Sequence, residues 1–191
     1  MSKSIKNTSR IEGKYTYLIP FTLEHAKSTQ YLTWMRDYEV IKTLNLLSYV
    51  EKPVSPKELE SYFKSIESAG NILFFALFAR EPEEFIGTVK IGRIDLDLGT
   101  GDVGIMVGEK QHWGRGYAKD ALYAICEFLF NEIKLRKLTS GLMANNPGMK
   151  KVFNRLGFQV EGIFRKTDYF EGQYIDHIHM GCFRDEFIKE L

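Results

Sequence analysis

Two kinds of apolar spacing alternate along this chain, one typical of buried strands and one typical of amphipathic helices. Residues 72–80 form a continuous apolar run, which predicts a strand buried on both faces. Residues 85–95 are predicted to return antiparallel to it across a turn, and residues 103–107 form a further short strand. Helical spacing begins near Ala118, where apolar side chains recur at positions 118, 121, 122, 125 and 129.

Local signals mark the other elements. Ser55-Pro-Lys-Glu58 is typical of a capping box with proline at the first helical position, so a helix is predicted from there to near Gly70. Thr22 is a candidate N-cap for an earlier helix through Leu32. The remaining predicted elements are strands at 15–20, 137–143, 159–165 and 174–182 and a short helix at 147–156.

The order of these elements predicts a single-domain α/β sandwich with a mixed central sheet of about seven strands and about four helices. Residues 1–12 are polar and are expected to be a flexible N-terminus, which leaves residues 13–191 as the domain. The strand–helix–strand crossover through 103–143 is expected to be right-handed, with its strands parallel at least at one end. If those strands splay at their C-terminal ends, a cleft opens between them.

The turn between the 103–107 strand and the next helix is rich in glycine. Such a strand-to-helix turn leaves backbone N–H groups unpaired at the positive end of a helix dipole, which suits a phosphate. Gly114 and Gly116 permit close backbone approach, and Arg115 adds charge. The alternative is an ordinary turn that uses glycine for steric reasons. The fingerprints of dinucleotide and nucleoside-triphosphate sites do not occur in the chain.

Residues 113–118, Trp-Gly-Arg-Gly-Tyr-Ala, resemble the coenzyme A pyrophosphate loop of the GNAT superfamily of N-acetyltransferases, whose pattern is [Q/R]-x-x-G-x-[G/A]. Trp113 departs from this pattern at its first position, whereas a shifted register over residues 111–116 fits it. The first register is preferred because it puts Ala118 at the start of the helix.

Three further segments resemble the family in its own order. They are residues 146–158 (an Asn, a helix, then Leu-Gly-Phe), 160–165 (the next strand) and 172–177 (the hairpin into the last strand). The resemblance covers residues 103–181 and is nearest to ribosomal-protein N-terminal and amino-sugar-nucleotide acetyltransferases. It implies acetyl-CoA as co-substrate, with its pantetheine arm in the cleft between the splayed strands. The residues it assigns to the cofactor are Ile105, Met106, Val107, Trp113, Gly114, Arg115, Gly116, Tyr117, Ala118, Asn146 and Phe153.

Transfer of acetyl to an amine requires a neutral nucleophile and a stabilised oxyanion. By the resemblance, a backbone N–H of residues 105–107 stabilises the oxyanion, and Asn146 holds the pantetheine or a water. The other interpretation of Asn146 is a helix N-cap. The candidate bases are Asp168 and Asp176 on the last hairpin, and each is equally readable as a solvated turn residue. His177, beside Asp176, is interpreted as a packed or exposed strand histidine, and two histidines are too few for a metal site.

The proton donor for the leaving thiolate is not apparent. Relatives carry donors at the places of Phe153 and Met149, side chains that cannot donate a proton. Tyr169, Tyr174 or a water are the substitutes. The lack of these donors is the one feature that favours an alternative function, a catalytically silent acyl-CoA-binding sensor or interaction module. Cys126 lies in a helix too apolar to activate a thiolate, so direct attack in a ternary complex is expected.

The sequence says least about the acceptor amine. It favours a protein N-terminus and an amino-sugar nucleotide or other small amine almost equally. Rings of the N-terminal third could stack on an acceptor, with helix-core packing as the alternative; they belong to Trp34, Tyr38, Tyr49, Tyr62 and Phe63. The net charge of +1 gives no reason to expect nucleic acid or a membrane as partner. Two distant cysteines and no signal or membrane-spanning segment indicate a cytoplasmic protein. A homodimer is left open.

Overall fold

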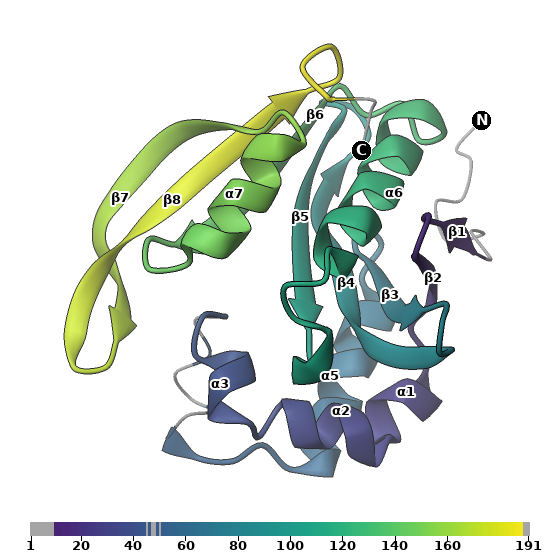
Figure 1. The fold of residues 1–191 in the computed structure, drawn as a ribbon, viewed down its shortest axis with the longest axis vertical. Coiled ribbons are helices and arrows are strands. Elements are labelled where there is room, and N and C mark those ends of the chain that lie inside the picture. The colour runs from purple at the N-terminus through teal and green to yellow at the C-terminus, as the bar shows by residue number, and fades with distance from the viewer. Residues whose placement is uncertain (1–9, 45, 47–48, 50, 189–191) are drawn as a thin grey trace.

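The computed structural model describes residues 10–44, 46, 49 and 51–188, and its centre is a β-sheet (Figure 1). The strands are Ile11–Glu12 (β1), Thr16–Pro20 (β2), Leu73–Ala79 (β3), Glu84–Asp95 (β4), Thr100–Val107 (β5), Lys137–Met143 (β6), Gln159–Phe170 (β7) and Gln173–Phe183 (β8). The helices are Leu23–Lys27 (α1), Thr29–Trp34 (α2), Tyr38–Ile41 (α3), Pro56–Ser68 (α5), Tyr117–Asn131 (α6) and Pro147–Arg155 (α7), with a 3-10 turn at Lys110–His112.

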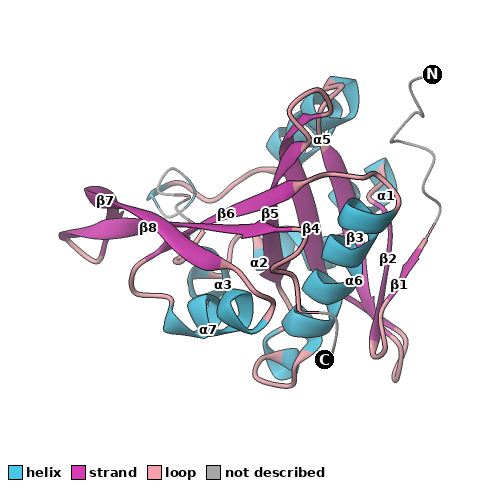
Figure 2. Ribbon diagram, turned by 90° about the horizontal axis from the view of Figure 1, so that it is seen from above, coloured by secondary structure: helices cyan, strands magenta, loops and turns pink. Residues whose placement is uncertain are grey.

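The eight strands lie in the order β1-β2-β3-β4-β5-β6-β8-β7. All neighbours are antiparallel except β5 and β6, whose parallel ladder is limited to Thr100–Asp102 against Lys137–Thr139. Beyond this ladder β5 continues beside β4 and β6 continues beside β8, so the two strands part toward their C-terminal ends. Figure 2 shows the β7–β8 hairpin extending away from β1–β5. The predicted mixed α/β sandwich is confirmed, and its central pair splays.

Two apolar cores lie on opposite faces of the sheet. On one face α6 packs through residues such as Leu122 against strand residues that include Leu77. On the other face α1, α2 and α5 pack through residues such as Leu59 against strand residues that include Ala76. Ala76 and Leu77 are neighbours on β3, so alternate side chains of this strand serve both cores. This double burial is the reason for the continuous apolar run at 72–80.

The structure departs from the predicted elements near the N-terminus. The helix predicted from Thr22 to Leu32 is divided at Ser28, whose extended backbone ends α1 and whose hydroxyl oxygen accepts a hydrogen bond from Tyr31 N to begin α2. Ile11 and Glu12, predicted to lie in the flexible tail, form β1 against Leu18 and Tyr17 because Ile11 is buried in the core. Residues 1–9 lie outside the described ranges.

A buried carboxylate joins this N-terminal hairpin to α6. Asp120 is 3% exposed, and its Oδ2 accepts hydrogen bonds from Tyr15 N, Thr16 N and Thr16 Oγ1 at 3.0, 2.9 and 2.7 Å. Its Oδ1 accepts a fourth from Lys14 N at 3.0 Å. Asp120 lies in the first turns of α6, where negative charge is favoured by the helix dipole. It therefore fixes the edge of the sheet to the start of the helix that follows the glycine-rich turn.

Candidate active site

The glycine-rich turn has a backbone that only glycine adopts without strain. Gly114 and Gly116 have φ of 74° and 88°, and Gly116 is the N-cap of α6. Gly116 has no side chain with which to cap this helix, so the N–H groups of its first turn face outward at the positive end of a 15-residue helix. Because the two positive-φ glycines are Gly114 and Gly116, the register from Gln111 to Gly116 fits the turn better than the register that ends at Ala118.

A cavity of about 490 Å³, the donor cavity, lies beside this turn. Its walls are the turn, the outer half of β5, one side of α7 along its length and residues between 39 and 44. Of the residues assigned to the cofactor from sequence, those that line it are Ile105, Met106, Val107, Trp113, Gly114, Gly116, Tyr117, Ala118 and Asn146. Arg115 is exposed outside its lining, and Phe153 lines a different cavity. Most of the residues assigned to the cofactor from the sequence therefore line one cavity.

Two contacts hold the surroundings of the donor cavity in place. Lys110 Nζ and Asp37 Oδ2 lie 2.5 Å apart, which ties the start of α3 to the 3-10 turn. The hydrogen bond from Lys110 lowers the pKa of Asp37. His112 is buried, with its Nε2 2.8 Å from Glu84 Oε2.

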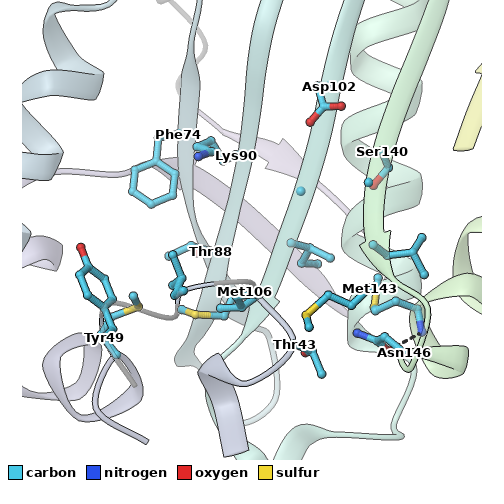
Figure 3. Close-up of a pocket in the computed structure, with 18 of the residues that line it drawn as sticks. Thr43, Tyr49, Phe74, Thr88, Lys90, Asp102, Met106, Ser140, Met143 and Asn146 are labelled. Atoms are coloured by element: carbon cyan, nitrogen blue, oxygen red, sulfur yellow. Dashed lines mark hydrogen bonds between the residues drawn. The ribbon is translucent and has the colours of Figure 1, made fainter. Parts of the chain in front are cut away.

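A second cavity of about 400 Å³, the acceptor cavity, lies on the sheet face that carries the N-terminal helices (Figure 3). Tyr49, Phe74 and Met106 give it apolar walls, and Lys90 and Asp102 add charged groups to its lining. Its remaining walls include glycines of β5 and β6, whose lack of a side chain leaves room. The cavity thus combines apolar surface with a few polar groups, the usual composition of a small-ligand site.

The two cavities meet at a shared wall. Six residues border both: Thr43, Leu44, Ile105, Met106, Asn146 and Met149. The edge of β5 that faces β6 has no strand partner beyond Asp102 among the described residues, so an extended ligand can hydrogen-bond there as an added strand. A thioester carried through the donor cavity would reach the acceptor cavity at this shared wall.

Asn146 caps α7 at the shared wall. Its Oδ1 accepts a hydrogen bond from Met149 N at 3.1 Å, which satisfies one orphan donor of the helix. Figure 3 shows the side-chain nitrogen directed into the cavity rather than toward the helix. The capping interpretation is therefore correct, and it leaves the amide N–H₂ group available to a ligand.

The carboxylates proposed as bases have different surroundings. Asp168 is 3% exposed and borders neither cavity, and its Oδ2 lies 2.6 Å from His177 Nδ1. Asp176 also borders neither cavity, and its Oδ1 accepts a hydrogen bond from Lys166 N at 3.0 Å. His177, by contrast, lines the acceptor cavity. The sequence analysis did not assign His177 to the acceptor site, although a turn at Glu171–Gly172 makes residues 168 and 177 diagonal neighbours on one face of the hairpin.

The candidate proton donors and aromatic rings are dispersed. Tyr169 and Tyr174 pack against each other at the exposed hairpin tip, away from both cavities. Of the aromatic residues suggested for the acceptor, Tyr49 and Tyr62 line the acceptor cavity. The other three do not: Trp34 and Phe63 are core residues, and Tyr38 donates to Glu171 Oε1 at 3.1 Å.

A covalent cysteine route has no support in the structure. Cys126 and Cys182 are both buried. Burial raises the pKa of the Cys126 thiol far above its ordinary value and that of Cys182 to about 12. Since the thiolate is the nucleophile, both side chains are inert at neutral pH. Among the residues that the structure describes, no group of three or more His, Cys, Asp or Glu side chains is placed to hold a metal ion, and no helix is long and apolar enough to cross a membrane.

Comparison with known proteins agrees with this geometry. A relative from Bacillus subtilis (strain 168), probable N-acetyltransferase YjcK, is 28% identical over 170 residues, covering 87% of this chain and 93% of its own. A spermidine N-acetyltransferase from Vibrio cholerae, solved with CoA and spermine, superposes with a TM-score of 0.79 at 17% identity, covering 90% of this chain and 97% of that one. RimL, a ribosomal L7/L12 alpha-N-protein acetyltransferase solved with coenzyme A, superposes with a TM-score of 0.79 at 16% identity, covering 93% and 99%.

The family assignment rests on a match over most of the chain. Residues 16–159 match the acetyltransferase (GNAT) domain family. This span includes the glycine-rich turn and β5, the strand that lines both cavities. The chain therefore belongs to the GNAT family of N-acetyltransferases, enzymes for which acetyl-CoA is the co-substrate.

Proposed function

We propose that this enzyme transfers acetyl from acetyl-CoA directly to a primary amine within a ternary complex. The observation that carries the proposal is the pair of cavities that share the wall of Ile105, Met106 and Asn146. Donor and acceptor can enter from separate sides and meet without exchanging places. Direct attack is supported further by the two inert, buried cysteines.

The donor cavity supplies two kinds of binding. The open N-terminus of α6 and the positive-φ glycines suit the pyrophosphate, because backbone N–H groups and the helix dipole both favour an anion. The free edge of β5 suits the amide-rich pantetheine arm. A backbone N–H of residues 105–107 is then the donor to the oxyanion that forms when the amine adds to the carbonyl carbon.

The acceptor is proposed to be a small primary amine or the first residues of a peptide. A cavity of about 400 Å³ lies at the small end of the range for ligand sites, so it suits a compact molecule or a chain end. A ribosomal-protein N-terminus and an amino-sugar nucleotide remain the two acceptor classes that the sequence favours. For the nucleotide class the sugar would occupy the cavity, and the nucleotide would extend beyond it.

The experiment is a thiol-release assay with acetyl-CoA and a panel of acceptors: a ribosomal-protein N-terminal peptide, an amino-sugar nucleotide, spermidine and simple alkylamines. Amine-dependent release of CoA is expected. Acetyl-CoA binding in calorimetry without release for any amine would favour the sensor alternative over the enzyme. The buried cysteines keep the protein's own thiols from reacting with the reagent.

Gly116→Asp tests the location of the donor site. A carboxylate at the N-terminus of α6 repels the pyrophosphate, and a side chain at φ 88° is strained. Acetyl-CoA affinity should fall at least about tenfold. The matched control is Gly70→Asp, where an added Cβ meets nothing within 4 Å. Arg115→Glu changes the charge without backbone strain, and unchanged affinity in both turn variants would refute this location.

A further inference from the structure

We infer that His177 is the general base that deprotonates the acceptor amine, and that Asp168 is its positioning residue. The inference rests on the proposed function and adds the group that handles the proton. His177 lies on β8 and lines the acceptor cavity, whereas Asp168 lies behind it on β7 and borders neither cavity. Their bond is short, with 2.6 Å between His177 Nδ1 and Asp168 Oδ2.

Asp168 is the more buried side chain of this pair. Its side chain is 3% exposed, against 22% for the His177 side chain. A buried carboxylate is costly unless it is paired and hydrogen-bonded. Because an ionised carboxylate can only accept, Asp168 selects the imidazole tautomer with the proton on Nδ1. The lone pair of Nε2 is then free of that bond and available to take a proton.

The hairpin is irregular where it supports this pair. The register of β7 against β8 shifts between Phe164 and Asp168, and Lys166 within that stretch has φ of 55°. Asp176 holds the irregular stretch, since its Oδ1 accepts from Lys166 N. Asp176, the second carboxylate suggested as a base, therefore supports the strand segment that buries Asp168.

The position of Nε2 is set by a missing side chain. A Cβ added to Gly141 on β6 would lie 2.4 Å from His177 Nε2, closer than any side chain is tolerated. Gly141 itself lines the acceptor cavity, so the ring edge that carries Nε2 faces the cavity wall left open by this glycine. The backbone of Gly141 does not require glycine, because its φ is not positive.

Among the residues that the structure describes, few other titratable groups face the ring. Asp168 faces it from β7, and His179 of the same strand has its ring centroid 4.9 Å away. The His179 ring packs on the Phe164 ring, with 4.3 Å between the two ring centroids, and His179 does not line the acceptor cavity. The charged side chains of that cavity, Lys90 and Asp102, have their own partners in Tyr62 and Thr139.

The protons and bonds balance with His177 as the single base. The acceptor arrives as an ammonium and loses one proton to Nε2, which passes it to water. The amine lone pair then forms the C–N bond, the C–S bond breaks, and the sulfur keeps the electron pair. The second proton lost by the nitrogen returns, through Nε2 or a water, to the thiolate. Since a thiolate is a good leaving group, no acid on α7 is needed, in agreement with Met149 and Phe153 there.

The test compares His177→Gln with His179→Gln, two neutral replacements on the same strand face. For His177→Gln, kcat should fall by about 10²- to 10³-fold, with acetyl-CoA affinity and melting temperature close to those of the wild type. The pH–rate profile of His177→Gln should differ from that of the wild type, because water then replaces the ring as base. His179→Gln should keep both the rate and the profile.

Asp168→Asn tests orientation separately, because an amide does not select the same tautomer. It should lower kcat by about 10²-fold or more while leaving KM for acetyl-CoA unchanged. Nitrogen NMR of the free enzyme gives a readout without turnover: the His177 ring should carry its proton on Nδ1 in the wild type and lose this preference in Asp168→Asn. An unchanged kcat and pH profile in folded His177→Gln, or a proton on Nε2 in the wild type, would overturn the inference. Absence of any turnover by the wild type would instead refute the proposed function.

Discussion

Replacing Gly141 with alanine perturbs the proposed base without removing any functional group. The added Cβ would lie 2.4 Å from His177 Nε2, about 1 Å inside ordinary van der Waals contact. The ring must therefore move by roughly 1 Å or lose its 2.6 Å bond to Asp168. A misplacement of about 1 Å in a catalytic group can cost about 10²-fold in rate. We expect kcat to fall by this factor.

The assay is thiol release at saturating acceptor and acetyl-CoA, with calorimetry for acetyl-CoA binding. Gly141 does not border the donor cavity, so acetyl-CoA affinity should not change. The control is Gly162→Ala on β7, where an added Cβ meets nothing within 4 Å and the rate should match the wild type. If Gly141→Ala keeps kcat within about threefold of the wild type, the position of His177 is not critical and the reasoning fails.

Three further predictions follow from other contacts. Asn146→Ser keeps an N-cap for α7 but removes the amide nitrogen, so kcat/KM should fall about tenfold with an unchanged melting temperature; full activity would leave only the capping role. Asp120→Ala should lower the urea-derived free energy of unfolding by about 3–5 kcal/mol, because it strands buried donors, with Asp120→Asn intermediate; a loss under about 1 kcal/mol would contradict this. Lys110 lowers the pKa of Asp37, so their contact stabilises the fold at pH values above the carboxyl pKa of the unfolded chain. This stabilisation is lost as the pH falls through the pKa of Asp37 in the folded protein. The stability of Asp37→Asn against acid unfolding should therefore depend less on pH than that of the wild type.

The fold was largely predictable because its signals are local. The capping box at Ser55 is present, with Ser55 Oγ accepting from Glu58 N at 3.3 Å and Glu58 Oε2 accepting from Ser55 N at 2.7 Å. The glycine-rich turn was equally predictable, because Gly114 and Gly116 both adopt the positive φ that glycine favours. The division of the first helix at Ser28 was not, because Ser28 serves as the end of one helix and the cap of the next.

The acceptor side was harder to predict because it depends on register. Asp168 looked like a solvent-accessible hairpin carboxylate, and its burial comes from a shift in the β7–β8 pairing that no residue type announces. The open space over His177 depends on Gly141, 36 positions earlier in the chain and on another strand. Only the paired strands bring these three residues together.

Initial-velocity kinetics with both substrates varied test the central claim most directly. Direct transfer in a ternary complex predicts that double-reciprocal lines intersect, and that CoA is released only when an amine is present. Labelled acetyl should then be recovered on the amine and not on the protein. Parallel lines, together with an acetylated protein formed from acetyl-CoA alone, would contradict the account.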